Sequence, residues 1–150
     1  MNIAFFMQPK ATVAYLYDDF TVRQALEKMH HHGYTAIPVL NHKGEYVYTL
    51  SEGDLLWFIV RGEGGTERQI DIENLENVYL SDLKVNPTRY QTVSIAAKID
   101  ELLSVALNQN FIPVLDDTDS FIGIVTRRTV IKHFYDNTFG DQDTMMDDSK

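Results

Sequence analysis

The chain contains the tetrapeptide Ile37-Pro38-Val39-Leu40, and the same four residues return 75 positions later as Ile112-Pro113-Val114-Leu115. The match continues without a gap for about twenty positions, so that Tyr46-Val47 corresponds to Phe121-Ile122. Since 75 is half of the 150 residues, the repeat predicts two similar units. We expect these units to pack on each other about a pseudo-two-fold axis and to leave two equivalent clefts between them, where function is expected.

Each unit is predicted to contain a strand, a helix, two strands and a second helix, which makes the fold class α+β. The first helix has Thr21 as its N-cap and Gly33 as its stop. In the first unit the predicted elements are a strand at 13–17, a helix at 22–32, strands at 35–40 and 46–50, and a helix after Ser51. In the second unit they are a strand at 92–95, a helix at 99–108, strands at 111–115 and 121–125, and a helix from about 126 to 136.

Glycine and charge patterns set the predicted boundaries. Three glycines within residues 62–65 mark the clearest break in the chain. The predicted organisation is an N-terminal segment plus first unit at 1–61, a linker at 62–82, a second unit at 83–136 and a disordered acidic tail at 137–150. We also expect an apolar turn at 2–8 that packs on the body of the protein.

Composition excludes several classes of protein. The apolar content of 44% supports a packed core, but a unit of this size buries little surface alone, so the halves are expected to need each other. The chain has no cysteine, which excludes disulfides and thiolate sites and fits a reducing compartment. A net charge of −9 argues against a nucleic-acid surface, and no apolar run reaches the length of a membrane span. No signal peptide is evident, so we expect a cytoplasmic protein.

The start of the second helix in each unit carries the polar residues that favour ligand binding. Ser51 and Asp54 lie three residues apart on one face of the first such helix, and Arg127-Arg128 open the other. A helix N-terminus attracts phosphate, a carboxylate can accept both hydroxyls of a ribose, and two arginines can bind phosphate. Each pattern also has a structural explanation: Ser-x-x-Asp is a helix-capping box, and paired arginines often form a solvated face.

The ordered set of motifs resembles a tandem pair of cystathionine-beta-synthase (CBS) domains, also called a Bateman module, over residues from about 7 to 135. The first unit carries the resemblance in the helix stop at Gly33, the stretch Tyr34-Thr35-Ala36-Ile37-Pro38-Val39 and the pair Ser51 and Asp54. The second unit carries it in Asn110-Phe111-Ile112-Pro113-Val114 and Phe121-Ile122-Gly123-Ile124-Val125-Thr126. The resemblance implies two CBS-type β-α-β-β-α repeats about a pseudo-two-fold axis. It also implies a ligand that contains adenosine, with each cleft built from both units.

Carried onto this chain, the resemblance assigns fifteen ligand-binding positions. The first cleft would combine Thr12, Ala14, Thr35 and Ala36 with Ile124, Thr126, Arg127, Arg128 and Thr129. The second cleft would combine Thr92, Asn110 and Phe111 with Leu50, Ser51 and Asp54.

Two positions depart from the family pattern. Thr129 stands where the family usually has the Asp that binds ribose, which puts ordinary ribose binding in the first cleft in doubt. Tyr48 stands where a Gly is common, which is expected to crowd the second cleft. The sequence Thr126-Arg127-Arg128 resembles short stand-alone CBS proteins of Firmicutes, some of which bind cyclic di-AMP, and two arginines suit a ligand with more than one phosphate charge.

Catalytic and metal sites are not expected. The side chains of His30-His31-His32 point about 100° apart on a helix and therefore cannot converge on one ion. The chain shows no nucleophile–base pair and no paired carboxylates placed for catalysis, although a small enzyme such as a nucleotide hydrolase remains an alternative.

The prediction is a non-catalytic regulatory module that binds an adenine nucleotide (AMP, ADP, ATP or cyclic di-AMP) between the two units and signals to an unknown protein partner. The alternative is a ligand-free dimerisation or interaction module with degenerate clefts. The resemblance implies a homodimer, lined by residues 55–59 with Trp57 and by Val130, Ile131 and Phe134. Within the helix after Ser51, we expect a buried face of Leu55, Leu56, Phe58 and Ile59.

Overall fold

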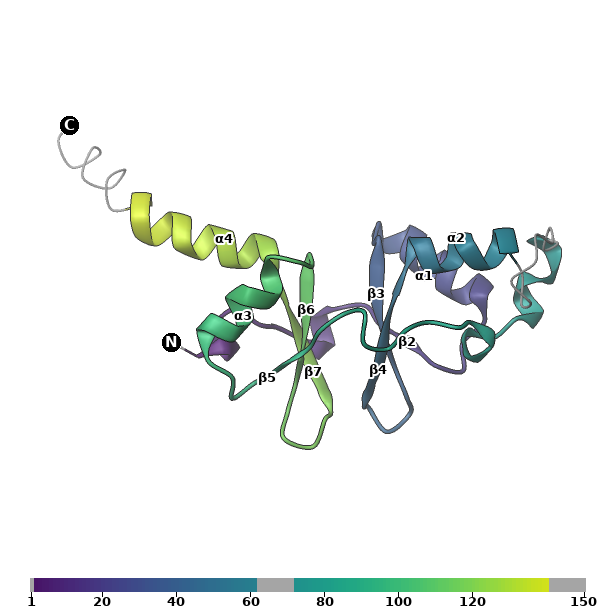
Figure 1. The fold of residues 1–150 in the computed structure, drawn as a ribbon, viewed down its shortest axis with the longest axis horizontal. Helices are drawn as coiled ribbons and strands as arrows, with labels where there is room; N and C mark the ends of the chain where they lie inside the picture. Colours follow the sequence, from purple (N-terminus) through teal and green to yellow (C-terminus); the bar gives the residue numbers. More distant parts are fainter. Residues whose placement is uncertain (1, 62–71, 141–150) are drawn as a thin grey trace.

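The computed structural model describes residues 2–61 and 72–140, and the predicted order of elements is confirmed (Figure 1). The first unit consists of β2 (Leu16–Tyr17), α1 (Val22–His32), β3 (Ala36–Leu40), β4 (Tyr46–Ser51) and α2 (Glu52–Arg61). The second consists of β5 (Val93–Ser94), α3 (Ile99–Ala106), β6 (Phe111–Leu115), β7 (Phe121–Thr126) and α4 (Arg127–Tyr135). Shorter elements are η1 (Ile3–Phe5), β1 (Gln8–Pro9), η2 (Lys10–Thr12), η3 (Ile72–Asn77), η4 (Leu80–Asp82) and the π-helical turn η5 (Asp136–Gly140).

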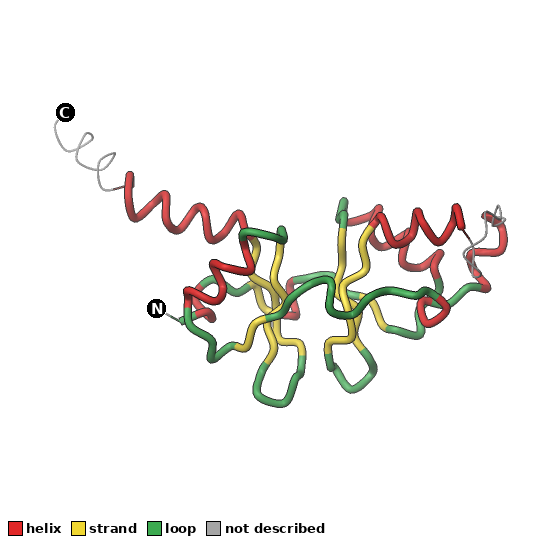
Figure 2. The backbone as a smooth tube through the Cα atoms, in the orientation of Figure 1, coloured by secondary structure: helices red, strands yellow, loops and turns green. Residues whose placement is uncertain are grey.

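Each unit has one sheet, and the two sheets repeat the same pairing. In the first, β2 runs parallel to β3 and β3 runs antiparallel to β4, with Ile37 opposite Leu50. In the second, β5 is parallel to β6 and β6 antiparallel to β7, with Ile112 opposite Val125. The two sheets stand next to each other at the centre of the molecule, and the helices of each unit lie on its outer side (Figures 1 and 2).

The units exchange the segments that precede them. Ile3 and Phe6, which come before the first unit, are buried in the core of the second. Leu80 and Leu83, which come before the second unit, are buried in the core of the first. Each core is therefore completed by chain from the other half, which confirms the expected apolar turn at the N-terminus and fits the expectation that the halves need each other.

A third apolar cluster joins the two sheets. It contains Val13 and Leu40 from the first half together with Phe121 and Ile124 from the second. The hairpins of the two units also touch, because the N–H of Phe121 donates to the carbonyl of Gly44 at 2.9 Å. The seam between the units is thus packed at its hairpin end.

Three sequence predictions about individual elements need correction. The first strand of each unit pairs over only two residues, and Val13, predicted within the first of these strands, instead belongs to the seam between the sheets. Helix α3 ends at Ala106, before the predicted 108. Leu56, predicted on the buried face of α2, is 59% exposed, while Leu55 and Phe58 are buried.

Two other predictions concern the ends of segments. Of the tail predicted at 137–150, residues 137–140 belong to η5, and 141–150 lie outside the described residues. The glycine-rich break at 62–66 and the adjoining part of the predicted linker up to 71 also lie outside them. Within the described parts of the chain, no helix combines the length and apolar character that crossing a membrane requires.

Candidate functional site

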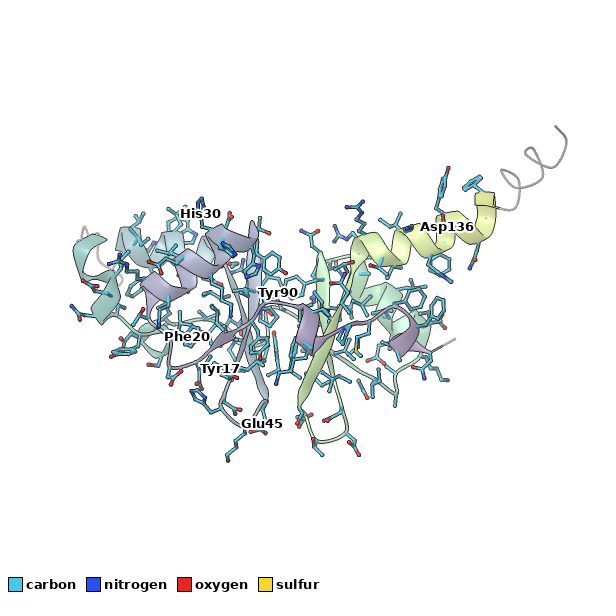
Figure 3. All side chains as sticks on the ribbon, turned by 180° about the vertical axis from the view of Figure 1, so that it is seen from behind. Tyr17, Phe20, His30, Glu45, Tyr90 and Asp136 are labelled. Atoms are coloured by element: carbon cyan, nitrogen blue, oxygen red, sulfur yellow. The ribbon has the colours of Figure 1, made fainter. Side chains whose placement is uncertain are left out.

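A cleft of about 500 Å³ opens between the two units, at the end of the sheets where the second helix of each unit begins. The start of β3 lies opposite the end of β4, where α2 begins, and the start of β6 lies opposite the end of β7, where α4 begins. Residues from the starts of β3, β6, α2 and α4 therefore all line this cleft. The cleft is lined by Thr35, Ala36, Ser51, Glu52, Gly53, Arg89, Tyr90, Asn108, Gln109, Asn110, Phe111 and Arg127. In the view from behind, Tyr90 lies between the two units (Figure 3).

The start of α2 is held by a reciprocal cap. The N–H and the hydroxyl of Ser51 each donate to Oδ2 of Asp54 at 2.9 Å, and the N–H of Asp54 donates to Oγ of Ser51 at 3.2 Å. The other carboxylate oxygen of Asp54 accepts a hydrogen bond from Nη1 of Arg89 at 2.9 Å. The Asp54 side chain is only 13% exposed, so its charge is both buried and compensated by Arg89, which lines the cleft.

The start of α4 has the same cap without a carboxylate. The N–H of Thr129 donates to Oγ1 of Thr126 at 3.2 Å, and the two hydroxyl oxygens lie 2.8 Å apart. Either hydroxyl can donate a hydrogen bond to the other. Because both groups are neutral, this cap carries no negative charge.

Arg127 reaches back across its own unit. Its Nε donates to the carbonyl of Ala106 at 2.8 Å, and its Nη1 donates to Oδ1 of Asn110 at 3.0 Å. The Ala106 carbonyl lies in the last turn of α3, the negative end of that helix, so the contact is favourable. A guanidinium has five N–H donors, and the bonds within the described residues leave others of Arg127 for a ligand in the cleft. Arg128 is exposed and does not line this cleft.

Gln109 locks the segment that carries Arg89 and Tyr90. Its buried amide donates to the carbonyls of Gln91 and Phe111 at 2.8 and 2.9 Å, and its Oε1 accepts from the N–H of Gln91 at 2.9 Å. The segment 89–91 is therefore fixed beside the start of β6, with Arg89 directed to Asp54.

Six of the fifteen predicted positions meet in this cleft. They are Thr35, Ala36 and Arg127 from the predicted first cleft and Ser51, Asn110 and Phe111 from the predicted second. The prediction assigned them to two separate clefts, whereas the structure brings them around one, because all of them lie at the same end of the two sheets.

The other predicted positions lie elsewhere. Asp54 sits behind the cleft, joined to it through Arg89. The side chains of Leu50, Ala14 and Ile124 are buried in the packed interior. Five further predicted residues are not buried and do not line this cleft: Thr12, Thr92, Thr126, Arg128 and Thr129.

Several lining residues were missed by sequence reasoning: Glu52, Gly53, Arg89, Tyr90, Asn108 and Gln109. A signal for Arg89 existed. The first strands of the two units, β2 and β5, begin 77 residues apart. At this offset Arg89 is the counterpart of Thr12, which was predicted to bind ligand. The offset falls to 75 only at β3 and β6, because α3 is three residues shorter than α1 while the stretch between α3 and β6 is one residue longer than that between α1 and β3.

Tyr48 does not crowd the cleft as expected. It packs against the core of the first unit, and its hydroxyl is buried without a hydrogen-bond partner. Burial, and secondarily the negative charges of Asp54 and Asp18, raise the pKa of Tyr48 to about 12. The group therefore stays neutral at physiological pH, close to but not within the lining of the cleft.

Comparison with known proteins agrees with this architecture. The model of the CBS domain family matches residues 6–61 and 81–136, and no curated protein sequence gives a significant match. CbpB, solved in complex with c-di-AMP, is 19% identical at a TM-score of 0.80, covering 95% of this chain and 91% of that one.

Two further solved structures are similar. A hypothetical conserved protein from Geobacillus kaustophilus is 24% identical at a TM-score of 0.78, covering 91% of this chain and 98% of that one. CBSX2 in complex with AMP is 23% identical at a TM-score of 0.70, with the same coverage of 91% and 98%. Because the family model matches twice and covers more than half of the sequence, this chain belongs to the CBS domain family, as a tandem pair of CBS units.

Proposed function

We propose that this protein is a non-catalytic regulatory module that binds an adenine nucleotide in the cleft between its two CBS units and signals to a partner protein. The observation that carries the proposal is the cleft itself, where two helix starts and two arginines, Arg89 and Arg127, meet at the seam. The similar structures of CbpB with c-di-AMP and of CBSX2 with AMP support the same class of ligand.

The chemistry of the lining suits a phosphorylated nucleoside. Backbone N–H groups at the starts of α2 and α4 and the guanidinium of Arg127 favour phosphate. Tyr90 and Phe111 are aromatic rings of the kind on which a base stacks, and Thr35 and Asn110 offer polar groups. The carboxylate of Glu52 is exposed at the rim and opposes an anion, so the phosphates belong on the Arg127 side.

Arg127 is the first candidate for phosphate because its known partners, Ala106 and Asn110, are neutral. Arg89, by contrast, is already paired with Asp54. Arg128 follows Arg127 on the exposed side of the helix start and would reach the phosphates of a larger ligand such as cyclic di-AMP.

Calorimetric titration of adenosine, AMP, ATP and cyclic di-AMP into the unmutated protein, Arg127→Ala and Arg128→Ala tests this assignment. Loss of a charge-assisted contact should weaken the phosphorylated ligands by about 2 kcal/mol, roughly thirtyfold, and spare adenosine. Lys132→Ala removes a positive charge from the same helix, exposed as Arg128 is and outside the lining of the cleft, and serves as the control. Equal affinities of Arg127→Ala and the unmutated protein for every phosphorylated ligand would show that Arg127 binds no phosphate.

The exposed apolar residues of the second helices favour one additional role, association with a second copy. On α2, Leu56 and Trp57 are 59% and 56% exposed; on α4, Ile131 and Phe134 are 60% and 44% exposed. We propose that these faces form a homodimer, either as the output of nucleotide binding or, if no nucleotide binds, as the principal function. Light scattering should then give a mass near twice 17.2 kDa at micromolar concentration. A thermal-shift panel of nucleotides separates the two roles, because only a ligand-binding module is stabilised.

A further inference from the structure

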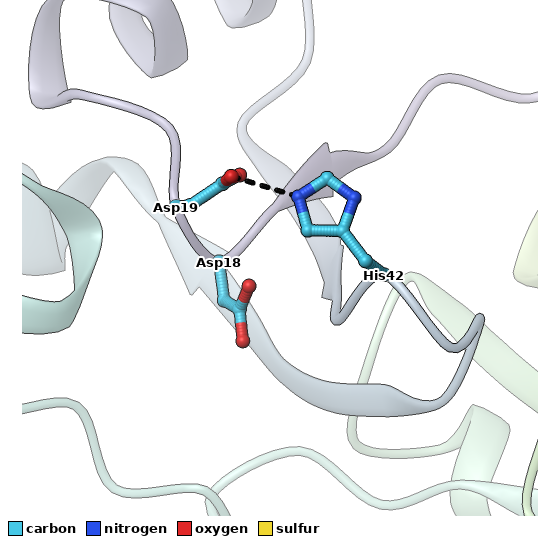
Figure 4. A group of neighbouring side chains, drawn as sticks. All are labelled: Asp18, Asp19 and His42. Atoms are coloured by element: carbon cyan, nitrogen blue, oxygen red, sulfur yellow. Dashed lines mark hydrogen bonds and ion pairs between the residues drawn. The ribbon is translucent and has the colours of Figure 1, made fainter.

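Three potential metal ligands gather at the opposite end of the first sheet from the cleft. Asp18 and Asp19 follow β2, and His42 follows β3. One ligand atom from each lies within 4.8 Å of the others (Figure 4). The cleft contains Thr35 and Ala36 at the start of β3, whereas His42 comes after its end, so this group is separate from the proposed nucleotide site.

The backbone holds these residues in place. The N–H of Asp18 donates to the carbonyl of Leu40 at 2.8 Å, which extends the β2–β3 pairing to the group. The N–H of Phe20 donates to the carbonyl of Tyr17 at 3.0 Å and closes the turn that carries both aspartates. In the hairpin, Oδ1 of Asn41 accepts hydrogen bonds from the N–H groups of residues 43 and 45 at 3.0 Å each, which fixes the turn around His42.

The side chains are also oriented. The ring of His42 stacks on the ring of Tyr17, with centroids 4.4 Å apart and planes 12° apart. In this position its Nε2 lies 2.8 Å from Oδ2 of Asp19. Among the hydrogen bonds and ion pairs of the described residues, none uses the carboxylate of Asp18, so this acceptor is available.

The second unit shows that the fold does not require these side chains. Its equivalent turn has the same backbone bond, from the N–H of Ile95 to the carbonyl of Leu115 at 2.8 Å. The counterparts of Asp18 and Asp19 there are Ile95 and Ala96, and the counterpart of His42 is Asp117. The same turn therefore forms with at most one metal-binding side chain, and the three in the first unit are additional to what folding needs.

We propose that Asp18, Asp19 and His42 bind a divalent first-row transition metal ion such as Zn²⁺. One imidazole with two carboxylates suits such ions, whereas Mg²⁺ and Ca²⁺ prefer oxygen ligands throughout. Metal–nitrogen and metal–oxygen bonds are about 2.0–2.2 Å, so small rotations of exposed side chains would bring the three donor atoms around one ion. His42 and Asp19 are 63% and 62% exposed, which leaves room for these rotations and for water as the remaining ligand. The ion would replace the His42–Asp19 hydrogen bond and link the turn after β2 to the β3–β4 hairpin.

The test is calorimetric titration of ZnCl₂ into EDTA-treated protein, with the unmutated protein compared with His42→Gln, Asp18→Asn and the control His31→Gln. His31 is an exposed histidine of α1 in the run His30-His31-His32, so its variant reports on metal binding by ordinary surface histidines. We expect one binding event to weaken at least about tenfold in both His42→Gln and Asp18→Asn, since even outer-shell changes cost 10–100-fold. We expect His31→Gln to keep the affinity of the unmutated protein.

A second readout is thermal unfolding with and without ZnCl₂. Zinc should raise the melting temperature of the unmutated protein and of His31→Gln, but not of His42→Gln. Unchanged zinc affinity in His42→Gln or in Asp18→Asn would overturn the three-residue site. An equal loss in His31→Gln would also overturn it, because the histidine run would then be the ligand.

Discussion

At the start of α2, Ser51 and Asp54 form a hydrogen-bonded cap whose carboxylate also binds Arg89; at the start of α4, Thr126 and Thr129 form the same cap without charge. The backbone is equivalent in both places. In each unit the N–H of the first residue of the second helix donates to the carbonyl of the residue that precedes the central strand. Glu52 donates to Thr35, before β3, at 2.9 Å, and Arg127 donates to Asn110, before β6, at 2.8 Å. A cap therefore requires only a hydroxyl, and the ion pair in the first unit is additional to it.

Both members of that ion pair change together between the units. The counterpart of Asp54 is Thr129, and the counterpart of Arg89 is Thr12. Thr12 instead donates its hydroxyl to the carbonyl of Pro9 at 2.9 Å. The repeat therefore sets where polar groups can be placed, and the particular side chains at those positions make the two helix starts differ in charge.

A second difference lies in the sheets. Strand β1 joins the second sheet beside Gly123, whereas the first sheet has no such added strand among the described residues. A Cβ at Gly123 would lie 2.3 Å from the carbonyl oxygen of Gln8 and 2.8 Å from the side chain of Met7. The counterpart of Gly123 is Tyr48, whose side chain fills the equivalent side of the first sheet.

The largest expected effect follows from this second difference. Gly123→Ala should destabilise the protein by about 3 kcal/mol, because the clash is with backbone that is already paired. Urea unfolding measures the change. The matched control is Gly53→Ala, where a Cβ meets nothing nearer than Oγ of Ser51 at 3.6 Å. In the helix this change should be neutral or stabilise by up to about 1 kcal/mol. A Gly123→Ala variant as stable as the parent would mean that β1 does not lie against β7.

The next effect concerns the ion pair and the ligand. Arg89→Ala should weaken phosphorylated nucleotides by about 1.5 kcal/mol, less than Arg127→Ala, because Arg89 lines the cleft but is already paired with Asp54, whereas Thr12→Ala should change affinity little. Calorimetric titration with AMP and cyclic di-AMP measures both. Equal losses in the two variants would show that the charge difference between the units has no part in binding.

A smaller effect separates the two caps in the absence of ligand. Asp54→Ala should lower the free energy of unfolding by about 1 kcal/mol, because it removes the acceptor of two Ser51 donors and of Arg89. Thr129→Ala removes one hydroxyl partner and should cost a few tenths of a kcal/mol. If the order of the two losses in urea unfolding is reversed, the charged cap is not the stronger one.

The smallest effect is expected at Tyr48. Its hydroxyl has no partner, so Tyr48→Phe should be neutral or stabilise by up to about 1 kcal/mol at pH 8. Burial raises the pKa of Tyr48 from 10.0 to about 12, so folding favours its neutral form. That contribution is fully present below pH 10 and is lost as the pH rises toward 12. The parent should therefore lose stability relative to Tyr48→Phe between pH 10 and 12, and parallel pH profiles would contradict the burial of this hydroxyl.

Much of the fold was accessible from local pattern. The recurrence of Ile-Pro-Val-Leu identified the central hairpins, and Thr21 does cap α1, with the N–H of Gln24 donating to its Oγ1 at 3.2 Å. Gly33 does end α1 in the left-handed conformation, with a φ of 68°. These features depend on residues within one turn or one hairpin, which is why sequence spacing predicts them.

Other features were not accessible in that way. Leu56 fits the apolar spacing of a buried helix face but is exposed, because α2 has no second layer of the described chain over that side. The cleft merges residues assigned to two clefts, because the pseudo-two-fold axis brings both helix starts to one place. Arg89 and Asp54 are 35 residues apart, and a sequence repeat at a single offset conceals their relation.

The sequence by itself determined the two-unit repeat, the order of strands and helices and the helix caps, since each depends on periodicity or on neighbours along the chain, and its motifs carried the resemblance to the CBS domain family. Only the tertiary structure decided that each unit is completed by the segment preceding the other, as Ile3 and Leu80 show. It also decided that Arg89 compensates Asp54 and that His42 meets two aspartates from another turn. These contacts join distant segments through packing of the whole molecule, and such packing leaves no periodic trace in the sequence.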